Sequence, residues 1–372
     1  MTEQIDPVLR TLRIERTGHS RLDETDFGAL GFGNTFADHM FSMRYCDGQW
    51  QQAEVLPYGP ITLEPGCVAL HYGQSVFEGL KAFRGADGQI RVFRADKNTE
   101  RLKDSCDRLC IPQLPEGTLG VAIRELIALD HGWVPSRRGQ ALYIRPLIFA
   151  EESHLEVRPA IAYRFIVMTA PVRTYYDNGF AAVGLKVQDA FTRAAPGGVG
   201  YAKTAGNYAA SLLPGDQSRT DGYDQALWLD GAEHKYVEEV GQMNIFFHLD
   251  GRIVTPDLRG TILPGVTRDS VITLLRDRGY QVEERRIEIA EIIDAIRSGS
   301  LSEAFGAGTA AVIAPVGRIG YKGETFDINE NAPGPIAELL YHDVLSIQLG
   351  ETNDKHQWTE LIDLPATSDK AG

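Results

Sequence analysis

The pattern of apolar residues changes once along the chain, from long apolar segments to short ones separated by turns. This change constrains the fold more than any other feature. Two long apolar segments, 140–150 and 161–170, have the length and residue types of buried β-strands. The stretch from Pro171 to Gly179 then breaks the pattern with Pro, Asp, Asn and Gly, as a linker does. Beyond it, short strand-like segments alternate with tight turns. The chain has 372 residues, which is enough for two cores.

We therefore predict an α/β (α+β) protein with two domains. An N-terminal arm, residues 1–27, contributes little core and precedes a smaller N-terminal domain, residues 28–170. An interdomain linker, residues 171–182, leads to a larger C-terminal domain, residues 183–372. The predicted helices are a short one within 74–80 and longer ones at 96–110, 118–131 (with Thr118 as the N-cap), 267–279 and 288–298.

Composition and charge exclude several classes of protein. Hydrophobic residues make up 43% and charged residues 24%, which is a globular composition. The net charge of −14 disfavours nucleic acid and anionic membranes as partners. No apolar run is long enough for a membrane span, and the first residues have no apolar signal core. The four cysteines and nine histidines show no metal-ligand spacing, so we expect no metal site and a cytoplasmic location.

A glycine-rich segment, Gly197–Tyr208, carries a single lysine, Lys203. Glycines allow backbone conformations that a Cβ forbids and let a ligand come close. A lysine withdrawn from water in such a loop loses its proton more readily, and the neutral amine can attack a carbonyl. Taken alone, a surface lysine in a turn is the commoner situation, so the interpretation depends on the motifs around it.

Glu239 lies in a strand-like segment among apolar neighbours, next to Glu238. A buried carboxylate needs a cation or hydrogen-bond donors. A protonated pyridine nitrogen meets that need, and it then withdraws electrons from the carbon attached to its ring. Because successive side chains of a strand point to opposite faces, we expect that the two glutamates do not both face inward. A glutamate in solvent at the end of a strand is the alternative.

Two further segments offer backbone N–H groups to an anion. Residues 263–269 run from a loop into a helix, whose first N–H groups lack partners and carry the positive end of the helix dipole. Thr267 either caps this helix or contacts a phosphate. Residues 306–311 match the Gly-x-Gly-x-x-(Gly/Ala) dinucleotide pattern, but a strand-like run with Pro315 follows where that pattern requires a helix. We therefore reject a dinucleotide site and expect these glycines to bring amides near a carboxylate or phosphate.

Two arginines occupy positions in predicted secondary structure where a charged side chain is unusual or can bind an anion. Arg145 lies inside an apolar strand, and Arg101 lies on the first amphipathic helix. A guanidinium binds a carboxylate or phosphate through two parallel hydrogen bonds. A buried structural ion pair is the alternative for Arg145. Four aromatic side chains are core residues by default: Tyr72, Phe77, Tyr143 and Tyr175.

Together these segments resemble the branched-chain amino acid aminotransferases, which use pyridoxal 5′-phosphate (PLP) and have the fold type IV architecture. The resemblance runs from about Phe32 to Gln348, and its strongest segments are 32–40, 71–82, 143–146, 197–208 and 239–244. It implies a small α/β N-terminal domain and a larger C-terminal domain with a barrel-like sheet. It also implies a homodimer, with Leu155 and Val157 at the interface.

The resemblance implies a cofactor role for several residues. Lys203 is the catalytic Schiff-base lysine, Tyr208 hydrogen-bonds the phenolic oxygen, and Glu239 pairs with the pyridine nitrogen. The phosphate is expected at Arg101, at the backbone of Val266 and Thr267, and at the Thr309 hydroxyl.

The resemblance also implies how substrates are bound. The amides of Thr309 and Ala310 are expected to take the α-carboxylate, and Arg145 the distal carboxylate of glutamate. The residues expected to line an apolar side-chain pocket are Phe32, Tyr72, Phe77, Tyr143, Tyr175 and Ala310.

The implied activity is reversible, ping-pong transfer of the amino group between L-leucine, L-isoleucine or L-valine and 2-oxoglutarate. A D-amino acid aminotransferase and a PLP lyase are the alternatives within the fold, and Arg145 and the Tyr72 loop argue against both. A non-catalytic binding protein is disfavoured by the joint presence of Lys203, Tyr208 and Glu239. Ala205 replaces a glycine that is common in the family, which is tolerable unless the position needs a positive φ.

Overall fold

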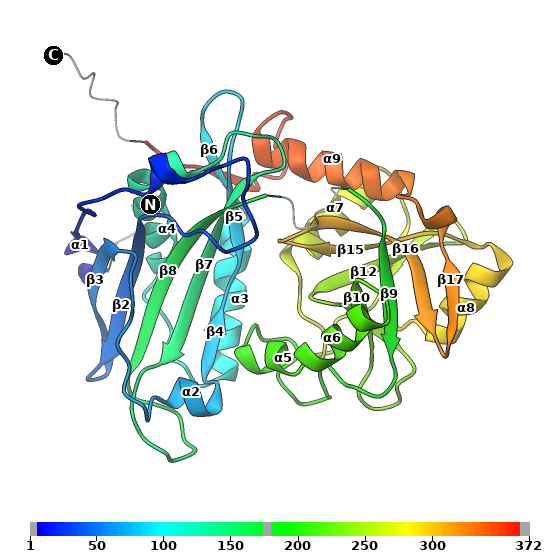
Figure 1. The fold of residues 1–372 in the computed structure, drawn as a ribbon, viewed down its shortest axis with the longest axis horizontal. Coiled ribbons are helices and arrows are strands. Elements are labelled where there is room, and N and C mark those ends of the chain that lie inside the picture. The colour runs from blue at the N-terminus through cyan, green and yellow to red at the C-terminus, as the bar shows by residue number, and fades with distance from the viewer. Residues whose placement is uncertain (1–5, 174–179, 365–372) are drawn as a thin grey trace. The chain divides into compact units, whose positions relative to one another are not determined.

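The computed structural model describes residues 6–173 and 180–364, and the chain divides into two compact units (Figure 1). The first unit comprises Met1–Arg173 and Ile347–Gly372, and the second comprises Thr174–Ser346. The division falls inside the predicted linker. The end of the chain, however, groups with the first unit and not with the predicted C-terminal domain. The reason is backbone pairing, because β18 (Thr359–Leu361) pairs antiparallel with β6 (Ile90–Phe93).

The first unit is built on a mixed sheet. In its described residues, nine strands form this sheet in the order β1-β3-β2-β8-β7-β5-β6-β18, with β4 paired to β7. The two long apolar segments are the central pair β7 and β8, which pair antiparallel from Ala141↔Val172 to Ala150↔Tyr163, as their length predicted. The other bounds are β1 (Arg13–Ile14), β2 (His39–Cys46), β3 (Gln49–Pro57), β4 (Ser75–Phe77), β5 (Leu80–Arg84), β7 (Ala141–Ala150) and β8 (Tyr163–Val172).

Helices pack their apolar sides into the core of this unit. Those of the first unit are α1 (Pro7–Arg10), α2 (Val68–Tyr72), α3 (Ala95–Arg108) and α4 (Thr118–Leu129), with 3₁₀ turns η1 (Leu22–Glu24) and η2 (His131–Trp133). In α4, Leu119, Ile123 and Leu126 recur at helical spacing and are buried, as the amphipathic pattern predicted. The arm contributes more core than expected, since Leu9 is buried in the same cluster.

Two local predictions in this unit are wrong. Thr118 is not the N-cap of α4, because Gly117 occupies that position with φ +76° and the Thr118 hydroxyl donates to the Pro115 carbonyl. The short helix expected within 74–80 does not form there. The nearest helix, α2, ends at Tyr72. Residues 75–77 instead form β4, because their backbone groups pair with β7.

The second unit contains a closed barrel. In its described residues, nine strands pair in the order β11-β10-β9-β16-β15-β12-β13-β14, with β17 on β16. An additional β11–β12 pairing closes six of them, β11-β10-β9-β16-β15-β12, into a ring, which confirms the predicted barrel-like sheet. The strand bounds are β9 (Val183–Gln188), β10 (Gln225–Leu229), β11 (Val237–Val240), β12 (Met243–Leu249), β13 (Arg252–Thr255), β14 (Val282–Glu284), β15 (Leu301–Gly308), β16 (Val312–Tyr321) and β17 (Glu324–Asp327).

Helices and an apolar cluster complete this unit. The helices are α5 (Ala205–Ala209), α6 (Leu212–Thr220), α7 (Val266–Asp277), α8 (Ile289–Ser298) and α9 (Pro335–Leu349), with a 3₁₀ turn η3 (Asn329–Asn331). The last residues of α9 belong to the first unit. Buried side chains of the barrel strands, such as Leu227, Val240 and Ile245, form one cluster with those of α8.

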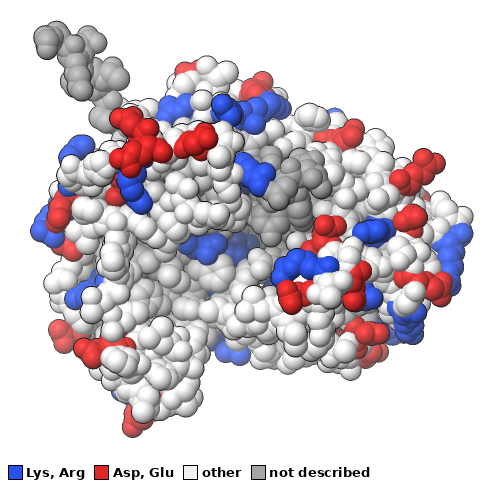
Figure 2. All heavy atoms as spheres, viewed as in Figure 1, with Lys and Arg blue, Asp and Glu red and all other residues white. Residues whose placement is uncertain are grey.

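The surface carries both signs of charge. On the face drawn in Figure 2, acidic and basic side chains are interspersed. Within residues 6–173 and 180–364, no helix is long and apolar enough to cross a membrane.

Candidate active site

The glycine-rich loop of the second unit places Lys203 directly before a short helix. Lys203 Nζ donates a hydrogen bond to Tyr208 Oη at 2.7 Å, because α5 turns Tyr208 back toward the lysine. Asn207 holds the loop by donating from Nδ2 to the carbonyls of Val199 and Ala202, each at 2.9 Å. Ala205 is helical and has no positive φ, so the replacement of a glycine there is accommodated. The structure thus brings Lys203 and Tyr208 together.

Glu239 is a buried carboxylate with both oxygens engaged. Only 2% of its surface is exposed. Arg193 Nε lies 2.7 Å from Oε2, and the backbone N–H of Leu263 donates to Oε1 at 2.6 Å. Burial raises the pKa of Glu239, whereas the charges of Arg193 and Lys203 and the Leu263 hydrogen bond lower that pKa. A solvent-exposed strand-end glutamate, the alternative reading of the sequence, is therefore excluded.

Arg193 is a residue of the site that the sequence analysis missed. Its guanidinium pairs with Glu239 and also donates from Nη1 to the Thr261 carbonyl at 2.9 Å and to the Gly200 carbonyl at 3.5 Å. Gly200 has to be a glycine, because a Cβ there would lie 2.3 Å from the Thr261 carbonyl oxygen. One arginine therefore ties the lysine loop, Glu239 and the 261–263 loop together. The sequence offered only an indirect indication of Arg193. A buried glutamate requires a cationic partner, but its sequence context does not identify which arginine or lysine that partner is.

Glu238 is buried as well, which differs from the expectation that one of the two glutamates faces solvent. Its exposed fraction is 7%, and Thr261 Oγ1 donates to Oε1 at 2.5 Å. Burial raises the pKa of Glu238. Adjacent side chains of β11 do point to opposite sides, but both sides of this strand are covered.

The predicted anion-binding segments have clear local structures. Helix α7 begins at Val266 with Gly265 as its N-cap, so Thr267 lies in the first turn and does not cap the helix. The turn 309–311 connects β15 to β16, so a strand follows the glycines, as predicted when the dinucleotide site was rejected. Gly306 and Gly308 also have a packing reason, since a Cβ at either position would lie 3.0 Å from the Met243 side chain.

The backbone just after this turn is held in an unusual conformation. Val312, the first residue of β16, has φ +64°, which is rare for a β-branched residue. Its side chain is buried, so packing holds the backbone there. Such strain is found preferentially at functional sites. The half-buried Thr309 and Ala310 are therefore presented on a turn with a fixed shape.

An arginine and three aromatic rings gather on one side of the first unit's sheet. The Arg145 guanidinium carbon lies 4.8 Å from the Phe77 ring centre and 5.3 Å from that of Tyr143, and Nη2 donates to Tyr143 Oη at 3.1 Å. Phe32 packs edge-on against Tyr143. Within the described residues, Arg145 has no carboxylate at ion-pair distance, and its buried Nε has no hydrogen-bond partner. The alternative of a buried ion pair for Arg145 is therefore not observed.

Arg101, in contrast, has a carboxylate partner. Its Nε and Nη2 donate to the two oxygens of Glu78 at 2.7 and 2.8 Å, and Asn98 also donates to Glu78. Glu78 is fully buried, so the bidentate pair fixes the direction of the arginine side chain. The predicted phosphate contact of Arg101 stays a prediction.

Two predicted lining residues remain, Tyr72 and Tyr175. Tyr72 is half exposed on α2, and its hydroxyl donates to the Leu155 carbonyl at 2.7 Å. Tyr175 lies outside the described residues.

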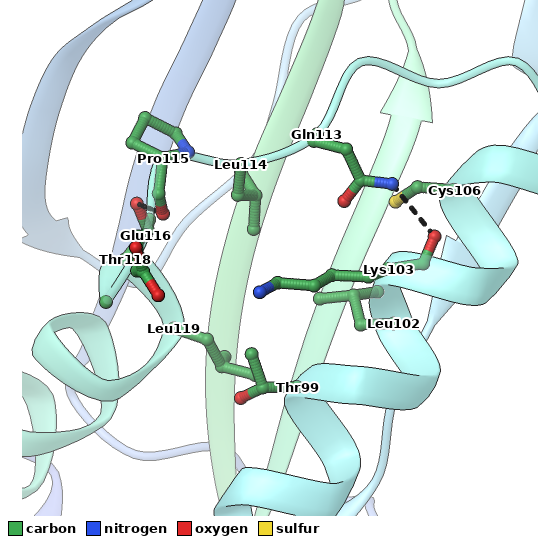
Figure 3. A pocket seen from close by; sticks show the side chains of 11 residues that line it. Thr99, Leu102, Lys103, Cys106, Gln113, Leu114, Pro115, Glu116, Thr118 and Leu119 are labelled. Atoms are coloured by element: carbon green, nitrogen blue, oxygen red, sulfur yellow. Dashed lines mark hydrogen bonds between the residues drawn. The ribbon is translucent and has the colours of Figure 1, made fainter.

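A small pocket in the first unit is unrelated to these residues. It lies between α3 and the segment that leads into α4, where Gln113 donates to the Lys103 carbonyl (Figure 3). Its free volume is about 20 Å³, which is room for one or two water molecules and too small for an amino acid. None of the predicted site residues lines it.

The groups in the second unit fit a phosphorylated pyridine aldehyde. An amine beside a phenol suits an aldehyde and a neighbouring ring oxygen, and a buried carboxylate suits a protonated ring nitrogen. A helix N-terminus suits a phosphate, and α7 begins at Val266. The donor set therefore matches the cofactor that the resemblance implied.

Comparison with known proteins shows the family. The profile of the family described as amino-transferase class IV matches residues 75–319, so the chain belongs to the class IV aminotransferases. Within them it is a branched-chain-amino-acid aminotransferase by similarity to curated relatives. It is 47% identical over 351 residues to branched-chain-amino-acid aminotransferase 2 of Bacillus subtilis, covering 94% of this chain and 96% of that protein. It is 48% identical over 334 residues to the Mycobacterium tuberculosis enzyme, covering 88% and 91%.

Solved structures agree with this assignment. The Escherichia coli branched-chain amino acid aminotransferase has a TM-score of 0.74 at 28% identity, covering 88% of this chain and 99% of that one. The T.th. branched-chain amino acid aminotransferase with pyridoxamine 5′-phosphate has a TM-score of 0.71 at 28% identity, covering 86% and 98%. The fold type IV architecture is thereby confirmed, and the cofactor of this family is PLP.

The Arg193–Glu239 pair generates a stability prediction. Arg193→Met leaves a buried carboxylate unpaired, so we expect the free energy of unfolding to fall by about 3–5 kcal/mol. Adding Glu239→Gln removes the unpaired charge and should recover part of that loss. Urea unfolding of the two single variants and the double variant measures both effects.

The exposed pair Arg297–Glu324 provides the matched control. Arg297→Met should cost less than about 1 kcal/mol, because solvent screens that pair. Strictly additive losses at Arg193 and Glu239 would contradict a direct pairing.

Proposed function

We propose that this enzyme moves the amino group reversibly between L-leucine, L-isoleucine or L-valine and 2-oxoglutarate, with PLP bound through Lys203. The observation that carries the proposal is the joint placement of Lys203, Tyr208 and Glu239 in the second unit. The relatives named above are all branched-chain aminotransferases, which supports this activity over a D-amino acid aminotransferase or a lyase. A cytoplasmic location stays a prediction.

The chain's own residues would divide the work as follows. When bound, PLP supplies an electron sink for the carbanion formed at the substrate Cα. Once the substrate amine has taken its place on the cofactor, the free Lys203 Nζ would accept the proton from the substrate Cα and deliver it to the cofactor carbon that bears the nitrogen, and its hydrogen bond to Tyr208 Oη would orient it for this. Glu239, which is paired with Arg193, would also pair with the protonated ring nitrogen. The N-terminus of α7 at Val266 and Thr267 and the Thr309 hydroxyl would take the phosphate, and a phosphate contact of Arg101 stays a prediction.

Substrate recognition would use a different set of groups. The amides of Thr309 and Ala310 take the α-carboxylate. Arg145 pairs with the distal carboxylate of glutamate, and the apolar side chains of leucine, isoleucine and valine pack against Phe32, Phe77 and Tyr143. The absence of a carboxylate partner for Arg145 in the described residues supports this role. An arginine flanked by aromatic rings suits a site that accepts both an acidic and an aliphatic side chain. Tyr72 and Tyr175 stay predicted lining residues.

We also propose that the enzyme is a homodimer that buries an apolar patch of the first unit. The patch lies on α2 and the β7–β8 loop, and its five side chains are 45–84% exposed. They are Leu70, Tyr72, Leu155, Val157 and Ile161. The Tyr72 hydroxyl bond to Leu155 joins the two segments into one surface. Contiguous exposed apolar side chains of this kind are typical of a protein interface.

The activity is tested by a single half-reaction. The PLP-loaded protein should convert L-leucine into 4-methyl-2-oxopentanoate with loss of the visible absorbance of the bound cofactor, and it should leave D-alanine unchanged. Lys203→Ala should reduce steady-state turnover by roughly four orders of magnitude or more, since it removes both the covalent anchor and the proton carrier. Loss of absorbance with D-alanine but not with L-leucine would refute the L-specific activity.

The role of Arg145 is tested by comparing substrates. Arg145→Met should raise the KM for 2-oxoglutarate by about 10–100-fold, because a charge-assisted hydrogen-bonded pair is lost. The KM for L-leucine should change by less than about threefold, since an aliphatic side chain makes no ion pair. Equal changes in both KM values would mean that Arg145 maintains the shape of the pocket and does not bind the distal carboxylate.

The proposed dimer is tested by placing charge in the patch. The double change Leu155→Asp and Val157→Asp should shift the sedimentation coefficient to that of a monomer, because two carboxylates would have to be desolvated in the interface. Leu361→Asp is the control, since Leu361 is also half exposed but lies on β18. If the double variant remains a dimer, this patch is not the dimer interface.

A further inference from the structure

The side chain of Asn244 joins two parts of the candidate cofactor site that backbone pairing does not join. On β12, Asn244 lies directly opposite Glu239 of β11. Directly opposite side chains of a sheet share a face, so Asn244 and Glu239 project to the same side. The next pair, Val240 and Met243, projects to the other side and lies in the apolar cluster. Asn244 is thus the immediate neighbour of the carboxylate proposed to meet the ring nitrogen.

Asn244 and Glu239 hold the same loop residue by its two backbone groups. Asn244 Nδ2 donates to the Leu263 carbonyl at 3.0 Å. The Leu263 N–H donates to Glu239 Oε1 at 2.6 Å. Asn244 is 5% exposed, so water does not readily replace its amide if the side chain is removed. The position of Leu263 relative to the carboxylate is therefore determined by a pair of side chains on adjacent strands.

Leu263 is separated from α7 by only two residues, and both restrict the connection. Pro264 has a fixed backbone φ. Gly265 lies against the asparagine, because a Cβ at position 265 would come within 2.0 Å of Asn244 Oδ1. Asn244 therefore contacts the loop at two points directly before the first N–H groups of α7. Asn244 is therefore one of the side chains that hold the start of this helix in place.

We infer that Asn244 is a positioning residue for the cofactor phosphate. By fixing the N-terminus of α7 relative to Glu239, it sets the separation at which the ring nitrogen and the phosphate are bound. The inference rests on the proposed function, since it requires PLP at these groups. An asparagine that only satisfies a buried carbonyl would affect the stability of the fold but would not discriminate between phosphorylated and unphosphorylated ligands.

The test compares two ligands that differ only in the phosphate. Dissociation constants of PLP and of pyridoxal are measured by absorbance for the full-length protein freed of cofactor. Asn244→Leu keeps the volume and removes the donor. It should weaken PLP binding by about tenfold, the equivalent of one buried hydrogen bond, and leave pyridoxal binding within about twofold.

A matched control and a second variant keep the inference open to refutation. Thr255→Val removes a comparable buried hydrogen bond, from Thr255 Oγ1 to the carbonyl of the next β12 residue, Ile245, and should not change the ratio of the two constants. Gly265→Ala presses on Asn244 from the loop side and should reproduce the selective loss even if Asn244→Leu does not fold.

The outcomes separate this inference from the proposed function. An unchanged ratio in both variants, or equal weakening of PLP and pyridoxal, would overturn the role of Asn244. Wild-type protein that binds pyridoxal as tightly as PLP would overturn the phosphate site itself, and with it this inference.

Discussion

The buried carboxylate of Glu239 needs a positive partner, and much of the second unit depends on how that need is met. Removing a carboxylate from water is costly unless a cation and hydrogen-bond donors replace the solvent. Arg193 and the Leu263 N–H supply both. The same arginine binds the carbonyls of Gly200 and Thr261, so the charge pair also connects the lysine loop to the loop before α7. The Arg193 side chain that compensates the charge of Glu239 thus also holds the loop that carries Lys203.

The first unit holds two of its arginines, Arg101 and Arg145, in opposite ways. Arg101 is neutralised by Glu78 through a bidentate contact, so its direction is set by the protein. Arg145 is held by a phenol and by ring faces, which orient a cation without neutralising it. Gly79 makes this possible, because a Cβ there would lie 2.0 Å from the Tyr143 hydroxyl. A cation that keeps its charge beside apolar rings can serve a substrate with or without a carboxylate.

Local pattern predicted most regular elements because their causes are local. The lengths of β7 and β8, the amphipathic faces of α3 and α4, and the strand after Gly308 all follow from residue types within one segment. The errors occurred where a neighbour outside the segment decided the outcome. Residues 75–77 became β4 because β7 offered a partner, and Gly117 displaced Thr118 as the cap because its positive φ turns the chain into α4.

The sequence by itself determined the chemistry-bearing residues and the family. Lys203, Tyr208 and Glu239 lie in motifs whose residue types suit only a few reactions, and a short helix is enough to bring Tyr208 to the lysine. Only the tertiary structure decided that Arg193 is the cation for Glu239, that Asn244 holds Leu263, and that the end of the chain joins the first unit. These contacts join segments far apart in sequence. Periodicity and composition report the environment of a segment but not the identity of its distant partner, and that partner is selected only when the packed fold brings the two together.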